Sequence, residues 1–276
     1  MRIEQALAKA TELPSESARA DVEYLLCEVL GKDRTYLRTW PDRELSPDQQ
    51  SHFLELFNQR LQGRPIAHIT GSRGFWNFDL EVNPSTLIPR SDTEVLVETA
   101  LELVDSLDAR VVDLGTGTGA IALALALEHP NWRVEACDRI LEAVLLARKN
   151  AVRLGAANMT VFEGSWFDPL SGRYQLIVSN PPYIDPVDPH LNQGDLVYEP
   201  SSALVADERG LADLHYIIDN APNYLAEGGW LLMEHGYDQA ETVAKRLAER
   251  GFSNLVMRED FGGNPRVSGG CWRSKC

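Results

Sequence analysis

The stretch Val178-Ser179-Asn180-Pro181-Pro182-Tyr183 holds residues whose types and order could do chemistry. It ends the apolar run 174–178, which is typical of a buried strand. Two consecutive prolines cannot continue a central strand, so the chain beyond it is a stiff loop. The carbonyls of Asn180 and Pro181 can accept hydrogen bonds from a planar NH2 group, and Tyr183 offers an aromatic face. We therefore predict a site for an amino or amide nitrogen.

A glycine-rich turn, Asp113-Leu114-Gly115-Thr116-Gly117-Thr118-Gly119, follows an earlier apolar run and opens a helix. Glycines allow backbone N–H groups to approach a ligand closely, and a helix start favours negative charge. The spacing G-x-G-x-G differs from the nicotinamide fingerprint G-x-G-x-x-G. By itself the turn indicates either a nucleotide-like ligand or only a tight connection between a strand and a helix.

Two further residues follow neighbouring predicted strands. Asp138 stands where a doubly wound nucleotide site places an acid to hold ribose hydroxyls; the alternative is an exposed loop acid. Trp166, in Ser165-Trp166-Phe167-Asp168, could cover a purine ring or belong to the core. Because the carboxyl ends of parallel strands share one edge of a sheet, we expect these residues to lie near the glycine-rich turn.

The segment Ile88-Pro89-Arg90-Ser91-Asp92-Thr93-Glu94 begins another predicted helix. Ser91 and Glu94 have the spacing of a capping box. Arg90 could simply precede the helix, or it could meet a carboxylate or a phosphate. Phe75 and Trp76 are interpreted as packing residues rather than ligand stackers.

Other chemistries lack support in the sequence. The six histidines are neither paired nor close to cysteines, so we expect no metal site. A G-x-S-x-G elbow is absent, which argues against a hydrolase. His235 ends a predicted strand, and a lone histidine of this kind is more often structural than a base.

Strand and helix patterns alternate after Val104, which predicts an α/β fold with a doubly wound, Rossmann-like sheet. The predicted strands are 110–114, 132–137, 160–162, 174–178 and 230–234, with short runs near Leu255 and Val267; the predicted helices are 120–128, 141–154, 211–225 and 239–250. The connection 186–202 is long and rich in proline, as binding loops often are.

The front of the chain has a different pattern. Residues 1–73 carry apolar positions at helical spacing and predict a small helical bundle, either a stabilising appendage or a substrate-docking domain. Ser46-Pro47 marks the start of one of its helices. Residues 74–90 predict a linker hairpin, and residues 91–276 the α/β domain.

Composition restricts the partners. The chain has 276 residues, a formal net charge of -15 and a pI of about 4.8, which opposes binding to phosphate backbones and favours a basic partner. The four cysteines, Cys27, Cys137, Cys271 and Cys276, form no C-x-x-C pair, and the start of the chain lacks an apolar signal core. We expect a cytoplasmic protein without a membrane anchor.

Together these motifs carry a family resemblance. The relevant segments are Arg64-Pro-Ile-Ala-His-Ile-Thr-Gly71, Thr86-Leu-Ile-Pro-Arg-Ser-Asp-Thr-Glu94, Asp113–Gly119 and Val178-Ser-Asn-Pro-Pro-Tyr-Ile184. The chain resembles the bacterial release-factor glutamine methyltransferases, the HemK/PrmC family, over nearly its whole length. The resemblance implies a class I methyltransferase fold with a small N-terminal helical bundle, and S-adenosyl-L-methionine as cofactor, which becomes S-adenosyl-L-homocysteine.

The resemblance also implies roles for individual residues. The cofactor would be held by Gly115, Thr116, Gly117, Thr118, Gly119, Asp138, Trp166 and Asn180. The substrate glutamine would be held by Asn180, Pro181, Pro182 and Tyr183, of which Asn180, Pro181 and Tyr183 would be catalytic. The chain departs from the family pattern at Ser91, at Ser165 and in the tail 268–276, which leaves the last strand open.

The predicted activity is methyl transfer to the side-chain amide nitrogen of the glutamine in the Gly-Gly-Gln motif of class 1 peptide chain release factors, with no direct nucleic-acid partner. The Asn-Pro-Pro-Tyr element also occurs in DNA adenine and ribosomal-RNA guanine methylases. The alternative is therefore a methyltransferase acting on an exocyclic amine of a nucleic acid. A third possibility is a silent cofactor-binding or assembly protein.

Overall fold

The computed structural model describes residues 1–273, and they divide into two compact units. We call Met1–Ser72 together with Asn192–Tyr198 the helical unit, and Arg73–Leu191 together with the chain from Glu199 onward the sheet unit. Within the described residues, no helix combines the length and the apolar character needed to cross a membrane. Each unit has its own apolar core.

The helical unit is built from short amphipathic helices. They are α1 (Ile3–Ala8), α2 (Ala18–Leu30), α3 (Arg34–Thr39), α4 (Pro47–Leu61) and α5 (Ile66–Thr70), with a 3-10 turn at Lys9–Glu12. The start of α4 at Ser46-Pro47 is as predicted, and Ser46 and Gln49 form a reciprocal capping box. Phe53 and Phe57 of α4 are fully buried against Leu25 and Leu26 of α2.

A buried ion pair lies in the same unit. Arg60 Nε donates to Asp21 Oδ2 at 2.8 Å, and Ser15 and Ser17 donate their hydroxyls to the same carboxylate. Arg60 Nη1 also donates to Asp195 Oδ1 at 3.3 Å. Because Asp195 belongs to the segment Asn192–Tyr198, a distant part of the chain helps to complete this unit.

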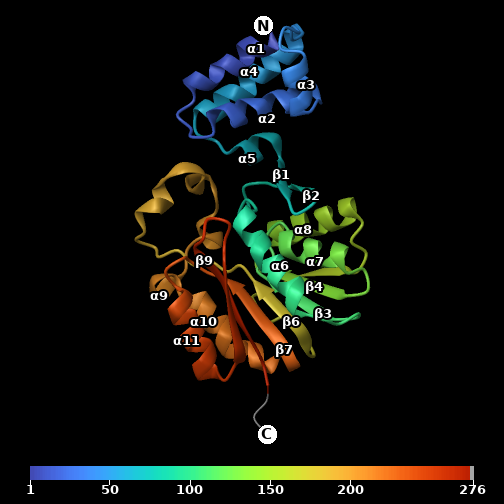
Figure 1. Ribbon diagram of the computed structural model, residues 1–276, viewed down its shortest axis with the longest axis vertical. Coiled ribbons are helices and arrows are strands. Elements are labelled where there is room, and N and C mark those ends of the chain that lie inside the picture. The colour runs from blue at the N-terminus through green and yellow to red at the C-terminus, as the bar shows by residue number, and fades with distance from the viewer. Residues whose placement is uncertain (274–276) are drawn as a thin grey trace. The chain divides into compact units, whose positions relative to one another are not determined.

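The sheet unit contains a seven-stranded sheet in the order β5-β4-β3-β6-β7-β9-β8 (Figure 1). The strands are β3 (Arg110–Leu114), β4 (Arg133–Asp138), β5 (Met159–Glu163), β6 (Tyr174–Ser179), β7 (Leu225–Glu234), β8 (Ser253–Glu259) and β9 (Pro265–Cys271). The neighbouring strands β5, β4, β3, β6 and β7 are parallel, whereas β9 runs antiparallel to both β7 and β8. Two short strands, β1 (Ser72–Phe75) and β2 (Phe78–Glu81), form a separate two-stranded sheet.

Helices cover both faces of the large sheet, as the alternating pattern predicts. Figure 1 shows α6 (Glu94–Leu103), α7 (Ala120–Glu128) and α8 (Leu141–Leu154) on one side and α10 (Ala212–Asn220) and α11 (Ala240–Arg250) on the other. A short helix, α9 (Asp207–Gly210), precedes α10. The predicted α/β fold with a doubly wound sheet is confirmed.

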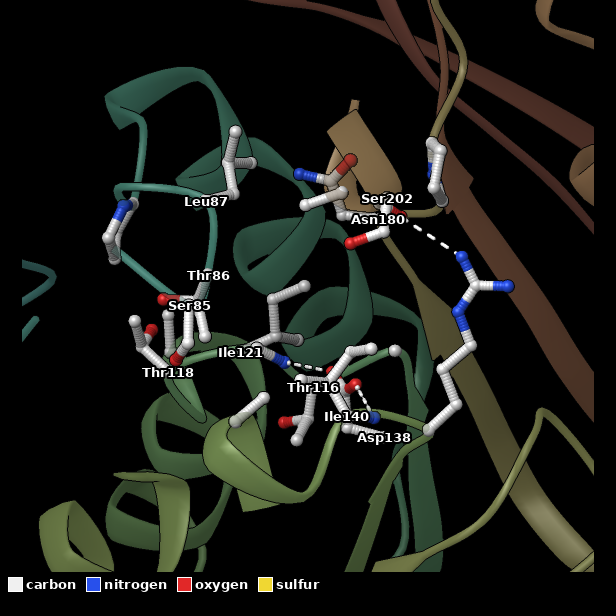
Figure 2. Close-up of a pocket in the computed structure, with 18 of the residues that line it drawn as sticks. Ser85, Thr86, Leu87, Thr116, Thr118, Ile121, Asp138, Ile140, Asn180 and Ser202 are labelled. Atoms are coloured by element: carbon white, nitrogen blue, oxygen red, sulfur yellow. Dashed lines mark hydrogen bonds between the residues drawn. The ribbon is translucent and has the colours of Figure 1, made fainter. Parts of the chain in front are cut away.

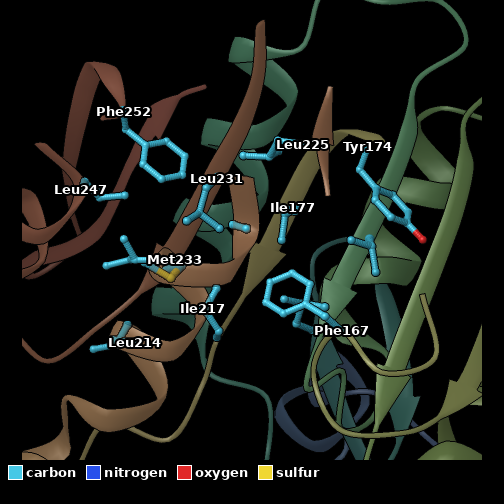
Figure 3. Close-up of a cluster of buried hydrophobic side chains, with 14 of the residues drawn as sticks. Phe167, Tyr174, Ile177, Leu214, Ile217, Leu225, Leu231, Met233, Leu247 and Phe252 are labelled. Carbon is cyan, nitrogen blue, oxygen red and sulfur yellow. The ribbon is translucent and has the colours of Figure 1, made fainter. Parts of the chain in front are cut away.

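One face of the sheet packs on α10 and α11 through a continuous apolar cluster (Figure 3). Ile177 and Leu231 of the central strands meet Leu214 and Ile217 of α10 and Leu247 of α11, and all five are fully buried. Burial of a leucine or isoleucine side chain contributes about 1.5–3 kcal/mol. This cluster therefore anchors the strands whose carboxyl ends carry the predicted site.

The last strand, which the departures in the tail left open, is present as β9. Its glycines fit a narrow space: a Cβ on Gly269 would lie 2.2 Å from the Leu231 carbonyl oxygen, and one on Gly270 would lie 2.9 Å from Phe252 Cβ. Glycine at these positions therefore lets neighbouring strands approach closely. Cys276 lies outside the described residues, while Cys27, Cys137 and Cys271 are free thiols.

The predicted capping box at Ser91 and Glu94 is wrong. Ser91–Thr93 forms a 3-10 turn ahead of α6, and Glu94 Oε1 instead accepts a hydrogen bond from the backbone N–H of Trp76 at 2.9 Å. A backbone donor from the β1–β2 connection thus replaces the expected local partner. The start of the helix itself is as predicted.

Candidate functional site

A pocket of about 930 Å³, which includes its open mouth, lies in the sheet unit around the carboxyl ends of β3, β4 and β6 (Figure 2). This is the edge at which open α/β sheets bind ligands. Its lining residues come from seven separate stretches of chain. They are Phe75, Ser85, Thr86, Leu87, Pro89, Thr93, Gly115, Thr116, Gly117, Thr118, Ala120, Ile121, Asp138, Arg139, Ile140, Ala143, Gly164, Ser165, Trp166, Asn180, Pro182, Ser202 and Ala203.

The glycine-rich turn forms one wall. The backbone N–H groups of Gly115 and Thr116 both donate to the Cys137 carbonyl at 2.9 Å, which ties the turn to the end of β4. Gly115 has φ +74°, and a Cβ there would lie 3.2 Å from the ring of Trp166. A larger residue at Gly115 would therefore strain the backbone and press on that ring.

Asp138 is fixed by the backbone around it. Its Oδ2 accepts from the Gly117 N–H and its Oδ1 from the Ile140 N–H, both at 2.9 Å (Figure 2). Burial raises the pKa of this half-buried carboxyl, and the two backbone donors oppose the rise. A carboxylate has about four acceptor positions, so Asp138 can still accept hydrogen bonds from a diol in the pocket.

The facing wall comes from the start of the segment Thr86–Glu94, which carries part of the family resemblance but was not predicted to line a ligand site. Ser85, Thr86 and Leu87 line the pocket, and a Cβ on Gly117 would lie 3.7 Å from Thr86 Cβ. Thr86 is 2% exposed, and its Oγ1 has no hydrogen-bond partner among the described residues. Phe75, interpreted as a packing residue, is indeed buried but also lines the pocket.

Asn180 lies at the pocket with its side chain already oriented. Its Nδ2 donates to Thr93 Oγ1 at 3.2 Å. Within residues 1–273, no donor reaches Asn180 Oδ1 or the Pro181 carbonyl. The loop thus keeps two oxygen acceptors available.

Hydrogen bonds hold both the side chain and the backbone of Tyr183 in place. Its hydroxyl donates to Glu234 Oε1 at 3.0 Å, and its carbonyl accepts from Gln239 Nε2 at 3.0 Å. A Cβ on Gly210 would lie 2.1 Å from that same carbonyl oxygen, so only glycine allows this approach. Burial raises the pKa of Tyr183, which keeps its hydroxyl a donor.

The predicted site residues fall into two groups. Those that line the pocket are Gly115, Thr116, Gly117, Thr118, Asp138, Trp166, Asn180 and Pro182. Gly119, Pro181 and Tyr183 do not line it. Gly119 stands at the start of α7, where a Cβ would meet Ala147 and Leu123 at 3.3 Å, so its small size serves helix packing. The roles given to all these residues stay predictions.

Arg90 and His235 both form hydrogen bonds within the fold. Arg90 Nη2 donates to both carboxylate oxygens of the buried Glu199 at 2.8 Å, which is the carboxylate alternative left open by the sequence. His235 is fully buried, and its ring nitrogens hydrogen-bond Ser268 Oγ and the Gly236 carbonyl at 2.8 Å. Neither side chain lines the pocket.

Thr93 and Glu234 are functional candidates that sequence reasoning missed. Thr93 stood inside the quoted segment Ile88–Glu94 and Glu234 directly before His235, but no pattern marked either as a partner of the acceptor loop. Their contacts with Asn180 and Tyr183 join residues 87 and 51 positions apart. The only available signal was that Glu234 ends the predicted strand 230–234, in the same sheet as the strand before Asn180; nothing in the sequence pointed to Thr93.

The pocket offers glycine backbone, one half-buried carboxylate, an aromatic ring and amide-type acceptors. A thiol nucleophile is disfavoured, because burial raises the pKa of Cys137 to about 12 and keeps it protonated. The arrangement suits a nucleotide-like ligand beside a substrate nitrogen.

Comparison with known proteins agrees with this chemistry. Residues 2–71 match the family model of the PrmC N-terminal domain, and residues 91–207 match that of the methyltransferase small domain. Solved structures share the fold at low identity: a methyltransferase from Pyrococcus furiosus (18% identical, TM-score 0.53, 80% of this chain and 99% of that one) and a Thermus thermophilus 16S rRNA methyltransferase crystallised with AdoMet and guanosine (19%, 0.52, 73% and 50%).

Curated relatives match over nearly the full length. The release factor glutamine methyltransferase of Pseudomonas aeruginosa is 51% identical over 268 residues, which cover 96% of this chain and 97% of that protein. The protein of the same name from Vibrio cholerae is 50% identical over 279 residues (99% and 98%), and that of Escherichia coli 47% over 255 (92% and 92%). The chain is therefore a methyltransferase that belongs to the release factor glutamine methyltransferase family.

Proposed function

We propose that the protein transfers a methyl group from S-adenosyl-L-methionine to the side-chain amide nitrogen of the glutamine in the Gly-Gly-Gln motif of class 1 peptide chain release factors. One observation carries this most directly: a proline-stiffened loop at the pocket leaves the Asn180 Oδ1 and the Pro181 carbonyl as free acceptors. Two acceptors on a rigid loop match the two N–H groups of a primary amide.

The residues present fit the cofactor. Asp138 would accept from its ribose hydroxyls, the backbone at Gly115 and Gly117 would approach its amino-acid part, and Trp166 would lie beside its adenine. The unpartnered hydroxyl of Thr86, 2% exposed, supplies a further polar group that a ligand would satisfy. When bound, S-adenosyl-L-methionine supplies a methyl group activated by its sulfonium charge.

The protein's own contribution is orientation. An amide nitrogen is a weak nucleophile because its lone pair is delocalised into the carbonyl. Hydrogen bonds from the substrate N–H groups to Asn180 Oδ1 and the Pro181 carbonyl would fix the amide plane and favour positive charge developing on nitrogen. Proximity effects of this kind contribute roughly 7–11 kcal/mol. No strong base is needed, because the methylated amide is very acidic until it loses its proton.

The protein partner is inferred from the family and from charge. We propose that the helical unit, predicted as residues 1–73, docks the release factor, and that the net charge of -15 favours a basic protein surface over nucleic acid. The nucleic-acid alternative would require a basic track for a flipped base. Because release factors act on ribosomes, we place the reaction in the cytoplasm.

Methyl-labelled cofactor tests the proposal. The protein is offered a release factor, ribosomal RNA and DNA side by side, and the label is followed into each. We expect label in the release factor alone, located by mass spectrometry on the glutamine of Gly-Gly-Gln. Label in nucleic acid and none in the release factor would overturn the proposal.

The variant Asn180→Ala tests the acceptor loop. It removes the oxygen proposed to orient the amide, so we expect turnover to fall about 100-fold or more, with cofactor affinity largely kept. Turnover is measured by label transfer and affinity by calorimetry. Asn220→Ala, on α10 and outside the pocket, is the matched control and should change neither. Equal losses of turnover and cofactor affinity in Asn180→Ala would contradict the assignment.

A further inference from the structure

Glu199 is a buried carboxylate that joins two walls of the pocket without lining it. The residue is 7% exposed, and its side chain is completely inaccessible. Arg90 Nη2 donates to both carboxylate oxygens at 2.8 Å, and the backbone N–H of Ile88 donates to Oε1 at 3.3 Å. These contacts join residues 109 and 111 positions apart. Because burying charges offsets most of what an ion pair gains, stability alone does not explain this pair.

One of the two walls has no regular structure of its own. We call residues 85–89 the facing wall, and most of them line the pocket. The stretch 82–90 around it forms neither helix nor strand, so no ladder of backbone hydrogen bonds holds it in place. Glu199 accepts from the Ile88 N–H inside the facing wall and from the Arg90 side chain directly after it. The facing wall therefore depends on partners from elsewhere in the chain, and Glu199 holds it at two points.

The other wall ends the long connection that follows the acceptor loop (180–183). We call residues 199–204 the return arm, and Ser202 is one of its residues that line the pocket (Figure 2). The Ile184 N–H, directly after the acceptor loop, donates to the Leu204 carbonyl at 2.9 Å. The return arm is thus attached to the acceptor loop at one end and, through the buried carboxylate, to the facing wall at the other.

A second contact holds the return arm less firmly. Arg139, which lines the pocket, donates from Nη2 to the Ser202 carbonyl at 3.4 Å in an exposed position. A hydrogen bond of this length is weak, and water competes with it. The bonds between Arg90 and Glu199 are shorter, join opposite charges and exclude water from the carboxylate. The ion pair is therefore the stronger of these two contacts.

We propose that the Arg90–Glu199 pair is a positioning device: it clamps the facing wall to the return arm and so holds the pocket at the width that fits S-adenosyl-L-methionine beside the acceptor loop. Neither residue lines the pocket, so both act through the walls they connect. The inference rests on the proposed function and adds to it two residues outside the Asn-Pro-Pro-Tyr loop and the glycine-rich turn.

The variant Arg90→Met tests the clamp. It keeps an unbranched side chain but removes the guanidinium, so the buried carboxylate would turn toward water and take the return arm with it. We expect the dissociation constant of S-adenosyl-L-methionine, measured by calorimetry without a release factor, to rise about 10-fold or more. Hydrogen exchange of the backbone amides in 84–90 and 199–206, followed by mass spectrometry, should become faster in the same variant.

Glu199→Gln tests the charge separately from the shape. Glutamine keeps one acceptor oxygen for Ile88 or Arg90 but loses the charge, so we expect the cofactor dissociation constant to rise only about threefold. The double variant Arg90→Met with Glu199→Gln no longer buries a carboxylate without its guanidinium. It should therefore bind the cofactor more tightly than Arg90→Met alone, whereas two independent losses would add.

Arg110→Met is the matched control. Arg110 Nη2 donates to both carboxylate oxygens of the buried Glu135 at 2.8 and 3.1 Å, and its side chain is 26% exposed, against 32% for Arg90. Arg110 begins β3, at the opposite edge of the sheet from the pocket. We expect this variant to lower the melting temperature about as much as Arg90→Met, with the cofactor dissociation constant changed less than about twofold.

The outcomes separate this inference from the proposed function. If wild-type protein binds the cofactor but methylates no release factor, the proposed function fails, and cofactor affinity still decides the positioning role. If Arg90→Met binds the cofactor as tightly as wild type, or exchanges hydrogen in the two walls no faster than Arg110→Met, the positioning role is overturned. If Arg90→Met does not fold, Glu199→Gln decides, and wild-type affinity and exchange in that variant would overturn the role.

Discussion

Asp113 shows how strongly one residue can be shaped by its position. It lies completely buried near the end of β3, where the Thr116 hydroxyl donates to Oδ2 at 2.6 Å, while Oδ1 has no hydrogen-bond partner in the described part of the chain. Burial raises its pKa from 3.8 to about 7. The aspartate that begins the glycine-rich turn is therefore a structural group with an unusual titration.

This titration predicts a pH dependence of stability. Between pH of about 4 and 7 the folded protein holds a proton on Asp113 that the unfolded chain has released, so this contribution to stability is fully present below about pH 4 and is lost as pH rises to about 7. Asp113→Asn cannot titrate. We expect its free energy of unfolding, measured with urea from about pH 5 to 7.5, to improve relative to wild type as pH rises. Parallel profiles would show that Asp113 has an ordinary pKa.

Individual residues also mark the limit of prediction from sequence. Asn180, Asp138 and Trp166 could be singled out because each follows a strand within a recognisable local pattern, and all three line the pocket. Thr93 and Glu234 could not, since their significance comes from contacts between segments that the fold brings together.

At the scale of elements, apolar runs predicted most strands closely, but the predicted strand 230–234 is only the second half of β7, and the predicted helix 211–225 runs past the end of α10 at Asn220. The prediction 110–114 coincides with β3, and 174–178 differs from β6 by one residue, because central parallel strands are apolar on both faces. The connection 186–202 gave no periodic signal, and the structure forms 3-10 turns at Pro189–Asn192, Gly194–Tyr198 and Ser201–Ala203. Such short turns depend on tertiary contacts rather than on periodicity.

The close packing of β9 leads to a prediction about stability. A Cβ on Gly269 would lie 2.2 Å from a backbone oxygen of β7, so Gly269→Ala must push two strands apart. We expect a loss of about 3 kcal/mol in the free energy of unfolding, measured with urea. Gly74→Ala is the control, because its Cβ would meet only Asp79 Oδ1 at an ordinary 3.5 Å, and it should cost less than about 1 kcal/mol. Equal effects of the two changes would argue against tight packing of β9.

At the scale of the whole molecule, the charge of -15 predicts how the enzyme meets its substrate. If a basic protein surface is recognised, kcat/KM for the release factor should fall several-fold between about 50 and 300 mM salt, because screening weakens attraction between exposed charges. Methylation of a short neutral peptide containing Gly-Gly-Gln should change little over the same range. A salt-independent kcat/KM for the release factor would contradict an electrostatic contribution.

The segment Asn192–Tyr198, which completes the helical unit, has a consequence for synthesis of the protein on the ribosome. Residues 1–72 emerge first, but roughly 120 further residues must be made before the segment that carries Asp195 appears. Synthesis proceeds at about 5–20 residues per second, so residues 1–72 exist for about 6–24 s before Asp195, a hydrogen-bond partner of Arg60, has been made. The first part of the chain to leave the ribosome therefore cannot finish folding until most of the second part has followed.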